Sequence, residues 1–318
     1  MARPSTQEWP PSREALRDIY WDRRLSLHKI GILFGKSASS VLQEMRKQGV
    51  ETRTLSEAMT VFEKLPFSND PNEKAYLQGL RAGDLHTARH GLSIRATVST
   101  THPAMLELVK DLLGRYGRVV ASPKFLRRTN QFEWEVYGYL HASFEFLVKP
   151  LEVTDESFLS FFAGFFDAEG TISIFKQHRS TTTGLRVEVS SCNRDLLLLI
   201  AEKLRRIGYG AYLSEKPVRR KGETIGYGPY NEDFWRLSLT RSNEALRLLR
   251  SLPLRHREKV VKKELALRCR KVPWVDVANQ VQALRASVEA EVNDCVQAAE
   301  RTYLNRHGKM IETTSPVV

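Results

Sequence analysis

The chain has 318 residues, of which 42% are hydrophobic and 27% charged, and its formal net charge is +12 at pH 7. This composition excludes a disordered chain and is sufficient for two or three domains with buried cores. The excess of lysine and arginine favours a polyanionic partner, either nucleic acid or an anionic membrane surface. No apolar run approaches the roughly 18 residues of a membrane helix, and no signal peptide opens the chain. We therefore expect an intracellular protein, cytoplasmic or nucleoid-associated, without a membrane partner.

The N-terminal region, residues 12–55, is predicted to be a small all-α domain. Ser12 caps a first helix, a second helix fits residues 27–34, and a third covers residues 38–48 after a short glycine turn. This arrangement is typical of a helix-turn-helix, whose last helix enters the major groove of DNA. An ordinary three-helix bundle with a solvated polar face is the alternative. The polar residues of the third helix that would contact DNA are Ser39, Ser40, Gln43, Arg46 and Lys47.

Residues 70–150 are predicted to form the first of two similar units. Its opening helix ends in the stretch from Leu77 to Leu85. Strict alternation over residues 92–99 then predicts a strand, with Leu92 on its buried face and Arg95 on its polar face. The remaining predicted elements are a helix over 103–116, strands over 118–123 and 132–139, and a closing helix over 142–148.

Residues 151–254 are predicted to repeat this order, because the same pattern of elements follows a second acidic helix. The expected elements are helices over 155–169, 194–207 and 242–251, and strands over 171–176, 185–190, 211–216 and 234–239. A basic helical extension, residues 255–306, follows. Its first helix, within 252–271, either contacts phosphates or packs as an ordinary amphipathic helix.

Each unit contains a helix with a glycine five residues before an acid: Gly79 and Asp84 in the first, Gly164 and Glu169 in the second. Glycine inside a helix costs about 1 kcal/mol, which close packing against a partner helix would offset. We expect the two helices to pack together and to bring the two acids side by side. Paired carboxylates suit hard divalent ions, which assist phosphodiester hydrolysis.

Both stretches resemble the signature of the LAGLIDADG homing endonucleases. Residues 162–170 follow the nine-residue pattern closely, with Glu169 at the metal-binding acid. In residues 77–85, Ala82 replaces the first acid and Leu85 the final glycine, while Asp84 keeps the metal-binding position. The resemblance covers roughly residues 70 to 255. It implies an α+β fold in which two pseudo-symmetric αββαββα halves form a saddle over DNA.

The resemblance also implies an activity. We expect a monomeric endonuclease that uses Mg²⁺, with Mn²⁺ as a substitute, to cut a long double-stranded DNA target. By analogy with the family, the carbonyls of Gly83 and Ala168 would complete the metal shell. Basic residues tend to lie where the fourth strand of each half meets its last helix, which is the place of His141 and Arg241. A hydrogen-bonded surface histidine and a phosphate clamp are the respective alternatives.

Polar strand faces and basic hairpin tips supply the other predicted DNA contacts. Exposed strand residues are polar in most proteins, so the collective excess of arginine and lysine matters more than any single residue. The predicted contacts are Arg95, Thr97, Ser99, Lys124, Arg127, Arg128, Lys176, Arg186, Glu188, Ser190, Arg219, Arg220, Lys221 and Arg236.

Two other functions stay open: a non-catalytic DNA-binding regulator that keeps the fold, and an RNA-binding maturase that assists intron splicing. Retention of both Asp84 and Glu169 favours the nuclease. Basic composition does not separate DNA from intron RNA. Asp167 has Ala82 as its counterpart, so we expect it to be a capping or packing acid rather than a shared catalyst.

Overall fold

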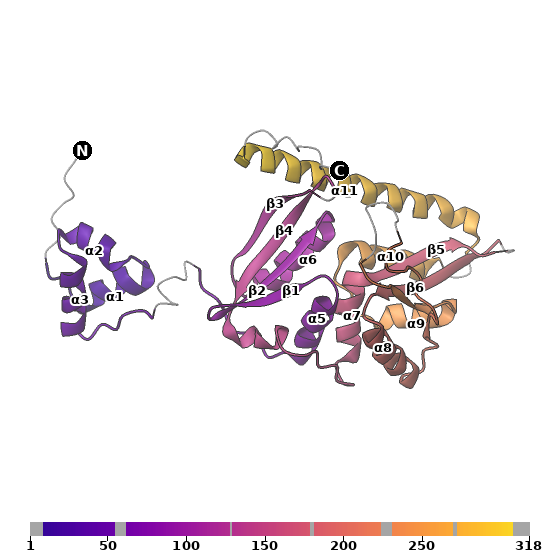
Figure 1. Cartoon of the computed structure of the whole chain (residues 1–318), viewed down its shortest axis with the longest axis horizontal. Coiled ribbons are helices and arrows are strands. Elements are labelled where there is room, and N and C mark those ends of the chain that lie inside the picture. The colour runs from indigo at the N-terminus through magenta and orange to yellow at the C-terminus, as the bar shows by residue number, and fades with distance from the viewer. Residues whose placement is uncertain are drawn as a thin grey trace. The chain divides into compact units, whose positions relative to one another are not determined.

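The computed structural model describes residues 9–54, 62–127, 129–178, 181–223, 231–269 and 272–307. The chain divides into two compact units, Met1–Glu63 and Lys64–Val318 (Figure 1). The predicted DNA contact Arg128 lies outside the described residues. In the described ranges, no helix combines the length and the apolar character needed to cross a membrane.

The N-terminal unit consists of short helices, each of which has a clear start. Its elements are α1 Arg13–Arg17, the π-helical turn η1 Asp18–Asp22, α2 Leu27–Phe34 and α3 Ala38–Lys47. The three α-helices begin after a serine whose hydroxyl accepts a backbone N–H of the first turn, and these serines are Ser12, Ser26 and Ser37. Gly35 ends α2 in the left-handed conformation, with φ of 64°. The core of the unit is made by Leu16, Ile30, Val41 and Met45, all fully buried.

The body contains the same order of elements twice. The first half comprises α5 Pro71–Ala82, β1 His86–His90, β2 Ser93–Thr100, α6 Pro103–Gly114, β3 Val119–Leu126, β4 Gln131–Leu140 and the 3-10 helix η2 Ala142–Leu147. The second comprises α7 Phe158–Glu169, β5 Gly170–Lys176, β6 Thr183–Ser191, α8 Arg194–Arg206, β7 Tyr212–Leu213, β8 Trp235–Leu239 and α9 Ser242–Ser251. Both sheets are antiparallel, with strand orders β1-β2-β4-β3 and β5-β6-β8-β7. The predicted α+β fold of two pseudo-symmetric halves is confirmed.

Two local expectations in the first half were wrong. Strand β1 was missed because its residues, His86–His90, are almost all exposed and polar, so they lack the alternation that marks a half-buried strand. Leu92 was placed on the buried face, yet it is 74% exposed in the turn that follows Gly91. Gly91, with φ of 59°, forms a tight turn together with Leu92, and β2 begins only at Ser93.

The lengths of two strands also differ from the predicted ones. Strand β3 runs to Leu126, so Lys124 belongs to the strand rather than to a hairpin tip. In the register Lys124 is opposite Glu133 of β4. Strand β7 is reduced to Tyr212–Leu213, shorter than the predicted 211–216.

Each sheet has a core face and a polar face. In β2, Ile94, Ala96 and Val98 are buried, whereas Arg95 and Thr97 between them are half-buried on the opposite face. The core face of the first sheet packs on α6, whose buried residues include Leu108 and Leu112. The polar face is therefore the side left for a partner.

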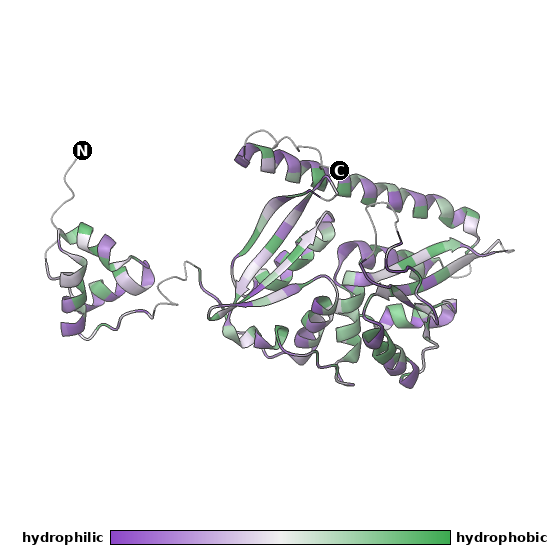
Figure 2. Cartoon of the chain, in the orientation of Figure 1, coloured by the Kyte–Doolittle hydropathy of each residue, from purple (hydrophilic) through white to green (hydrophobic). Residues whose placement is uncertain are grey.

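The C-terminal extension consists of α10 Arg257–Arg268 and α11 Trp274–His307. Figures 1 and 2 show α11, which mixes hydrophobic and hydrophilic residues along its length, lying across β3 and β4. Trp134 donates from Nε1 to the carbonyl of Cys295 at 3.1 Å, and the ring of Tyr303 lies 5.4 Å from that of Phe132. Trp134 also lines one cavity with Leu106 of α6, so α11 packs on the core face of the sheet.

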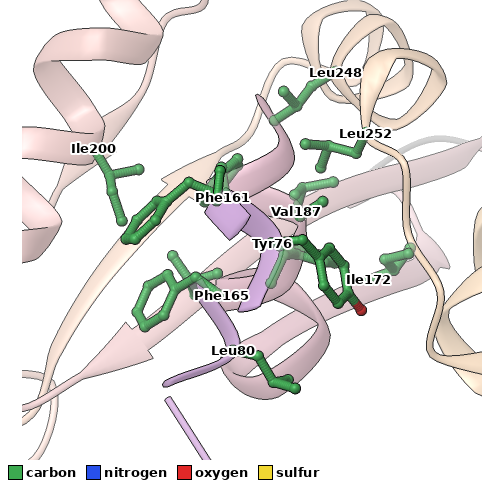
Figure 3. Packing of buried hydrophobic residues seen from close by; sticks show 14 of the residues in the cluster. Tyr76, Leu80, Phe161, Phe165, Ile172, Val187, Ile200, Leu248 and Leu252 are labelled. Atoms are coloured by element: carbon green, nitrogen blue, oxygen red, sulfur yellow. The ribbon is translucent and has the colours of Figure 1, made fainter. Parts of the chain in front are cut away.

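Helices α5 and α7 pack directly against each other at the centre of the body (Figure 1). A Cβ added to Gly79 would lie 1.9 Å from the Phe161 carbonyl oxygen, and one on Gly164 would lie 2.0 Å from the Tyr76 carbonyl oxygen. The backbones therefore approach as closely as glycine allows. Core residues around the pair, drawn in Figure 3, come from both helices, the second sheet and the helices behind it: Tyr76, Leu80, Phe161, Phe165, Ile172, Val187, Ile200 and Leu248.

Replacing Gly164 with alanine is expected to lower the free energy of unfolding by about 2–3 kcal/mol, because the new methyl group would force the helix backbones apart. Urea denaturation measures this change. Gly114→Ala in α6 is the matched control, since nothing lies within 4 Å of its added Cβ. Equal stability of the two variants would contradict close packing through Gly164.

Candidate active site

The two predicted acids follow directly on the two packed helices. Asp84 lies two residues beyond α5, and Glu169 is the last residue of α7. A Cβ added to Gly83 would lie 2.4 Å from Cβ of Ala168 and 3.0 Å from Cγ of Glu169. Since Gly79 meets Phe161 while Gly83 meets Ala168, the helices run parallel. The fold thus brings Gly83, Asp84, Ala168 and Glu169 to one place.

Glu169 is half-buried and Asp84 is exposed, yet neighbouring protein atoms partly desolvate both carboxyl groups. Burial, followed by the charge of Asp84, raises the pKa of Glu169 to about 7, while the charge of Lys259 opposes this shift. Asp84 is the more exposed of the two acids, but partial desolvation still raises its pKa. Electrostatic interactions with Lys259 and His102 oppose this rise. Two poorly solvated carboxyl groups next to each other form a site that a cation would stabilise.

Asp167, two residues before the end of α7, is fully buried and has a structural role. Its Oδ2 accepts hydrogen bonds from the Tyr76 hydroxyl at 2.6 Å and from the backbone N–H groups of Arg255 at 2.7 Å and His256 at 3.2 Å. Burial raises the pKa of Asp167, and these hydrogen bonds oppose the rise. Asp167 therefore joins α5, α7 and the segment before α10, as expected of a packing acid.

Lys259 of α10 is a residue of this site that the sequence did not reveal. Its Nζ donates to the carbonyl oxygens of Phe166 at 2.7 Å, Asp167 at 2.7 Å and Ala168 at 3.0 Å. Burial lowers the pKa of Lys259 to about 8, while the nearby carboxylates, Asp167 first, counteract the fall. In the sequence Lys259 is one of many basic residues between 252 and 271, and no local signal distinguishes it.

A second ion-pair cluster borders the acids. His102, which precedes α6, has Nδ1 3.4 Å from Oε2 of Glu258, and Lys262 contacts Oε1 of the same glutamate at 2.5 Å. The hydrogen bond with His102, together with Lys262, lowers the pKa of Glu258 to about 2. His256 is buried, and burial lowers its pKa to about 3, so it is neutral near pH 7.

The donors present fit a divalent ion in part. No group of three or more histidine, cysteine, aspartate or glutamate side chains in the described ranges is arranged to hold a metal. An ion here would rely on Asp84, Glu169, backbone carbonyls and water, which are oxygen donors that hard divalent ions accept. Of the two carbonyls implied by the family resemblance, that of Ala168 already accepts a hydrogen bond from Lys259.

The contacts that the structure gives for His141 and Arg241 are with residues other than the two acids. His141 is exposed, and its Nδ1 accepts a hydrogen bond from the N–H of Ser143. It follows Leu140, which pairs with Ile94 of β2, three residues before Thr97, the partner of His86. Arg241 is exposed and pairs with Glu244 at 3.2 Å. Neither contributes to the pKa shifts of Asp84 and Glu169.

The predicted arginines on the polar sheet faces are paired with glutamates. Arg95 lies 3.2 Å from Glu135, a residue that was not among the predicted contacts. Arg186 and Arg236 contact Glu188 at 3.1 and 3.6 Å, so Glu188 holds two arginines in place. These faces therefore present oriented guanidinium groups with part of their charge neutralised.

The other predicted contact residues are distributed over both units. Those with exposed side chains are Ser39, Gln43, Arg46, Lys47, Ser99, Lys124, Arg127, Lys176, Arg219, Arg220 and Lys221, and those half-buried are Ser40, Thr97 and Ser190. Lys176 is two residues from the buried Ile174, so its side chain lies on the same face of β5 as Ile174. Arg186 is opposite Ser173 in the register and therefore lies on the other face. It does not share the polar face with the arginines.

The second half of the body matches a known protein family. Residues 157–269 match the profile of a LAGLIDADG-like domain, a match that includes α10. No curated protein matches the sequence.

Several solved structures are similar to the chain. The homing endonuclease I-DmoI shares 15% identity over 57% of this chain and 94% of its own, with a TM-score of 0.33. The meganuclease I-SmaMI, bound to uncleavable DNA, shares 10% identity over 67% of this chain and 97% of its own, with a TM-score of 0.42. The N-terminal LAGLIDADG domain of WhiA shares 16% identity over 61% of this chain and 89% of its own, with a TM-score of 0.38.

Replacing Glu169 with glutamine is expected to stabilise the metal-free protein at pH 8 by about 2 kcal/mol and to have little effect at pH 4. The pKa of Glu169 rises from 4.5 to about 7 on folding, so the folded protein retains a proton that the unfolded chain has lost between these values. Wild-type stability therefore falls as the pH rises through this window, and an uncharged side chain avoids the loss.

Chemical denaturation in EDTA at the two pH values measures the effect. Glu202→Gln, at an exposed position of α8, controls for the removal of one negative charge. A glutamine variant of Glu169 that is less stable than the wild type at pH 8 would contradict the burial of an ionised group there.

Proposed function

We propose that this chain, which belongs to the LAGLIDADG family through its residues 157–269, is a site-specific endonuclease that hydrolyses double-stranded DNA with a divalent metal ion. The observation that carries the proposal is the juxtaposition of Asp84 and Glu169. Two matched halves each deliver one acid to the same end of a parallel helix pair.

The chemistry follows from the donors at this place. A divalent ion held by Asp84 and Glu169 would activate a water molecule and neutralise charge on the scissile phosphate. Carboxylate and carbonyl oxygens favour Mg²⁺, and Mn²⁺ would substitute for it. The chain's own part is to hold the two carboxyl groups together, partly desolvated, next to the ammonium group of Lys259 and the imidazole of His102.

The polar sheet faces support DNA as the substrate. Arg95, Arg186 and Arg236 are half-buried and held by glutamates, so their guanidinium groups are oriented before a ligand binds. Guanidinium groups bind phosphate well because their planar fork of donors matches its oxygens. We therefore assign one sheet face to each half of the target along the duplex, with a single chain covering a long site.

We assign residues 12–55 to a helix-turn-helix that adds DNA contacts, residues 70–150 and 151–254 to the two halves, and residues 255–306 to the C-terminal extension. Helix α3 starts at the Ser37 cap and exposes Gln43, Arg46 and Lys47. An exposed polar helix after a tight turn suits insertion in the major groove.

A non-catalytic DNA-binding protein is the second candidate. It is favoured by Lys259, which already holds the Ala168 carbonyl that an ion would otherwise use. The two candidates share the fold and the DNA surface and differ only in hydrolysis.

The test is incubation of the purified chain with a library of duplexes and Mg²⁺, followed by sequencing of cut ends. We expect cleavage at a preferred sequence. Asp84→Asn and Glu169→Gln should each lower the cleavage rate by at least about 100-fold while retaining DNA binding, because each removes an anionic ligand of the ion. The control is Asp111→Asn, an exposed acid of α6.

Two results would contradict the proposal in different ways. Sequence-specific binding without metal-dependent cleavage would establish the non-catalytic candidate. Cleavage that survives both substitutions would mean that the hydrolytic centre lies elsewhere.

A further inference from the structure

The last turn of α7 presents three successive backbone carbonyls to one cation. Lys259 Nζ donates to Phe166, Asp167 and Ala168 at 2.7, 2.7 and 3.0 Å. An ammonium group has three N–H donors, so all of them are used by these oxygens. The negative end of the helix dipole lies at the same place and adds to the attraction. The ammonium group of Lys259 therefore occupies a place where a free cation could also bind.

This cation lies at the candidate active site. Ala168 is the residue before Glu169, and Gly83 of the other half packs on its side chain. The charge of Lys259 acts on Asp84 and Glu169 together, since it favours the ionised form of each. The ammonium group thus serves the same two carboxyl groups that would attract a divalent ion.

The surrounding contacts hold Lys259 in position. The segment before α10 is fixed by the hydrogen bonds that Arg255 N and His256 N donate to Asp167. Arg257 pairs with Glu107 at 3.0 Å and with Glu291 at 2.6 Å, which ties α10 to α6 and α11. These anchors, all within four residues before Lys259, make its position a property of the fold rather than of a mobile surface side chain.

We propose that Lys259 is a tethered cation of the carboxylate pair, which occupies the Ala168 carbonyl and confines a divalent ion to the Asp84 side of the centre. The consequence for cleavage rests on the proposed function, whereas the effect on ion binding does not. The two halves of the centre then differ. The first half, with Asp84, departs more from the family signature but offers the better metal site.

The alternative is that Lys259 only caps the C-terminal end of α7, as lysines often do. Lys263 offers a matched comparison on the same helix, because its Nζ donates to the carbonyl of Leu252 at the end of α9, at 2.9 Å. It makes the same kind of contact away from the two acids. A capping role predicts similar behaviour of the two lysines towards ions, and the proposal predicts a difference.

The experiment measures Mn²⁺ binding to the full chain at pH 7 without DNA, by titration calorimetry. Lys259→Met is expected to bind Mn²⁺ at least about tenfold more tightly than the wild type, because a like charge is removed from the ion site. Lys263→Met should bind as the wild type does. Adding Glu169→Gln to Lys259→Met should abolish the gain, which places the ion at the pair.

Mn²⁺ affinity of a folded Lys259→Met variant within twofold of the wild type would overturn the proposal. Should that variant fail to fold, Lys259→Gln keeps two N–H donors without the charge and carries the same expectation. Anomalous diffraction from wild-type crystals with Mn²⁺ gives a variant-free check. An ion on the Ala168 carbonyl with Lys259 displaced would overturn the proposal, and an ion at Asp84 with Lys259 in place would support it.

The outcome is independent of cleavage. If no duplex is cut but Lys259→Met binds Mn²⁺ more tightly, the endonuclease proposal fails and the tethered cation stands. If duplexes are cut and the substitution leaves Mn²⁺ affinity unchanged, the endonuclease stands and Lys259 is a helix cap.

Discussion

The close packing of α5 on α7 is the constraint from which the rest of the body follows. Gly79 and Gly164 leave room only for backbone atoms between the helices, so the two halves are joined in a fixed register. Because the helices run parallel, their C-terminal ends meet, and the acids that follow them must share one small volume. Each sheet then starts within three residues of an acid, at His86 and Gly170. One contact thus sets the symmetry, the site and the strand positions.

The same packing creates an electrostatic problem that the chain answers with its own cations. Two carboxyl groups and the end of a helix dipole are gathered where water has limited access, which raises the pKa of both Asp84 and Glu169. Lys259, supplied by α10, offsets part of this cost. Asp167 fixes the segment that carries the lysine, so the buried acid and the cation form one unit with α7. The C-terminal extension is in this respect part of the centre.

Charge on the sheet faces is organised in a related way. A net charge of +12 suggests a freely basic surface, yet Arg95, Arg186 and Arg236 are all paired with glutamates. Such pairs orient the guanidinium groups and lower the repulsion between them in the unbound protein. Phosphates of a bound duplex would compete with Glu135 and Glu188 for the same donors. In the proposed complex with DNA, the glutamates would make binding depend on close geometric fit as well as on charge.

Local sequence patterns were sufficient to predict an element when all the residues that define it lie in one segment. The glycine-to-acid spacing identified both central helices and both acids, and apolar alternation located the buried faces of β2 and β6. Segments without a buried face gave no such signal, which is why the exposed edge strand β1 was missed. Resemblance to a family placed His141 and Arg241 by their order in the chain, and that order does not fix their distance from the acids.

The sequence by itself determined that two matched helices end in acids, that two similar α+β halves surround them, and that the chain is strongly basic. These properties depend on residues close together along the chain. Only the tertiary structure decided which cation serves the acids. Lys259 is 91 residues from Ala168, and among many basic residues of its region only its position in α10 distinguishes it. A hydrogen bond forms between groups that are close in space. For two residues so far apart in the sequence, that closeness depends on how the helices pack and not on the residues next to either one.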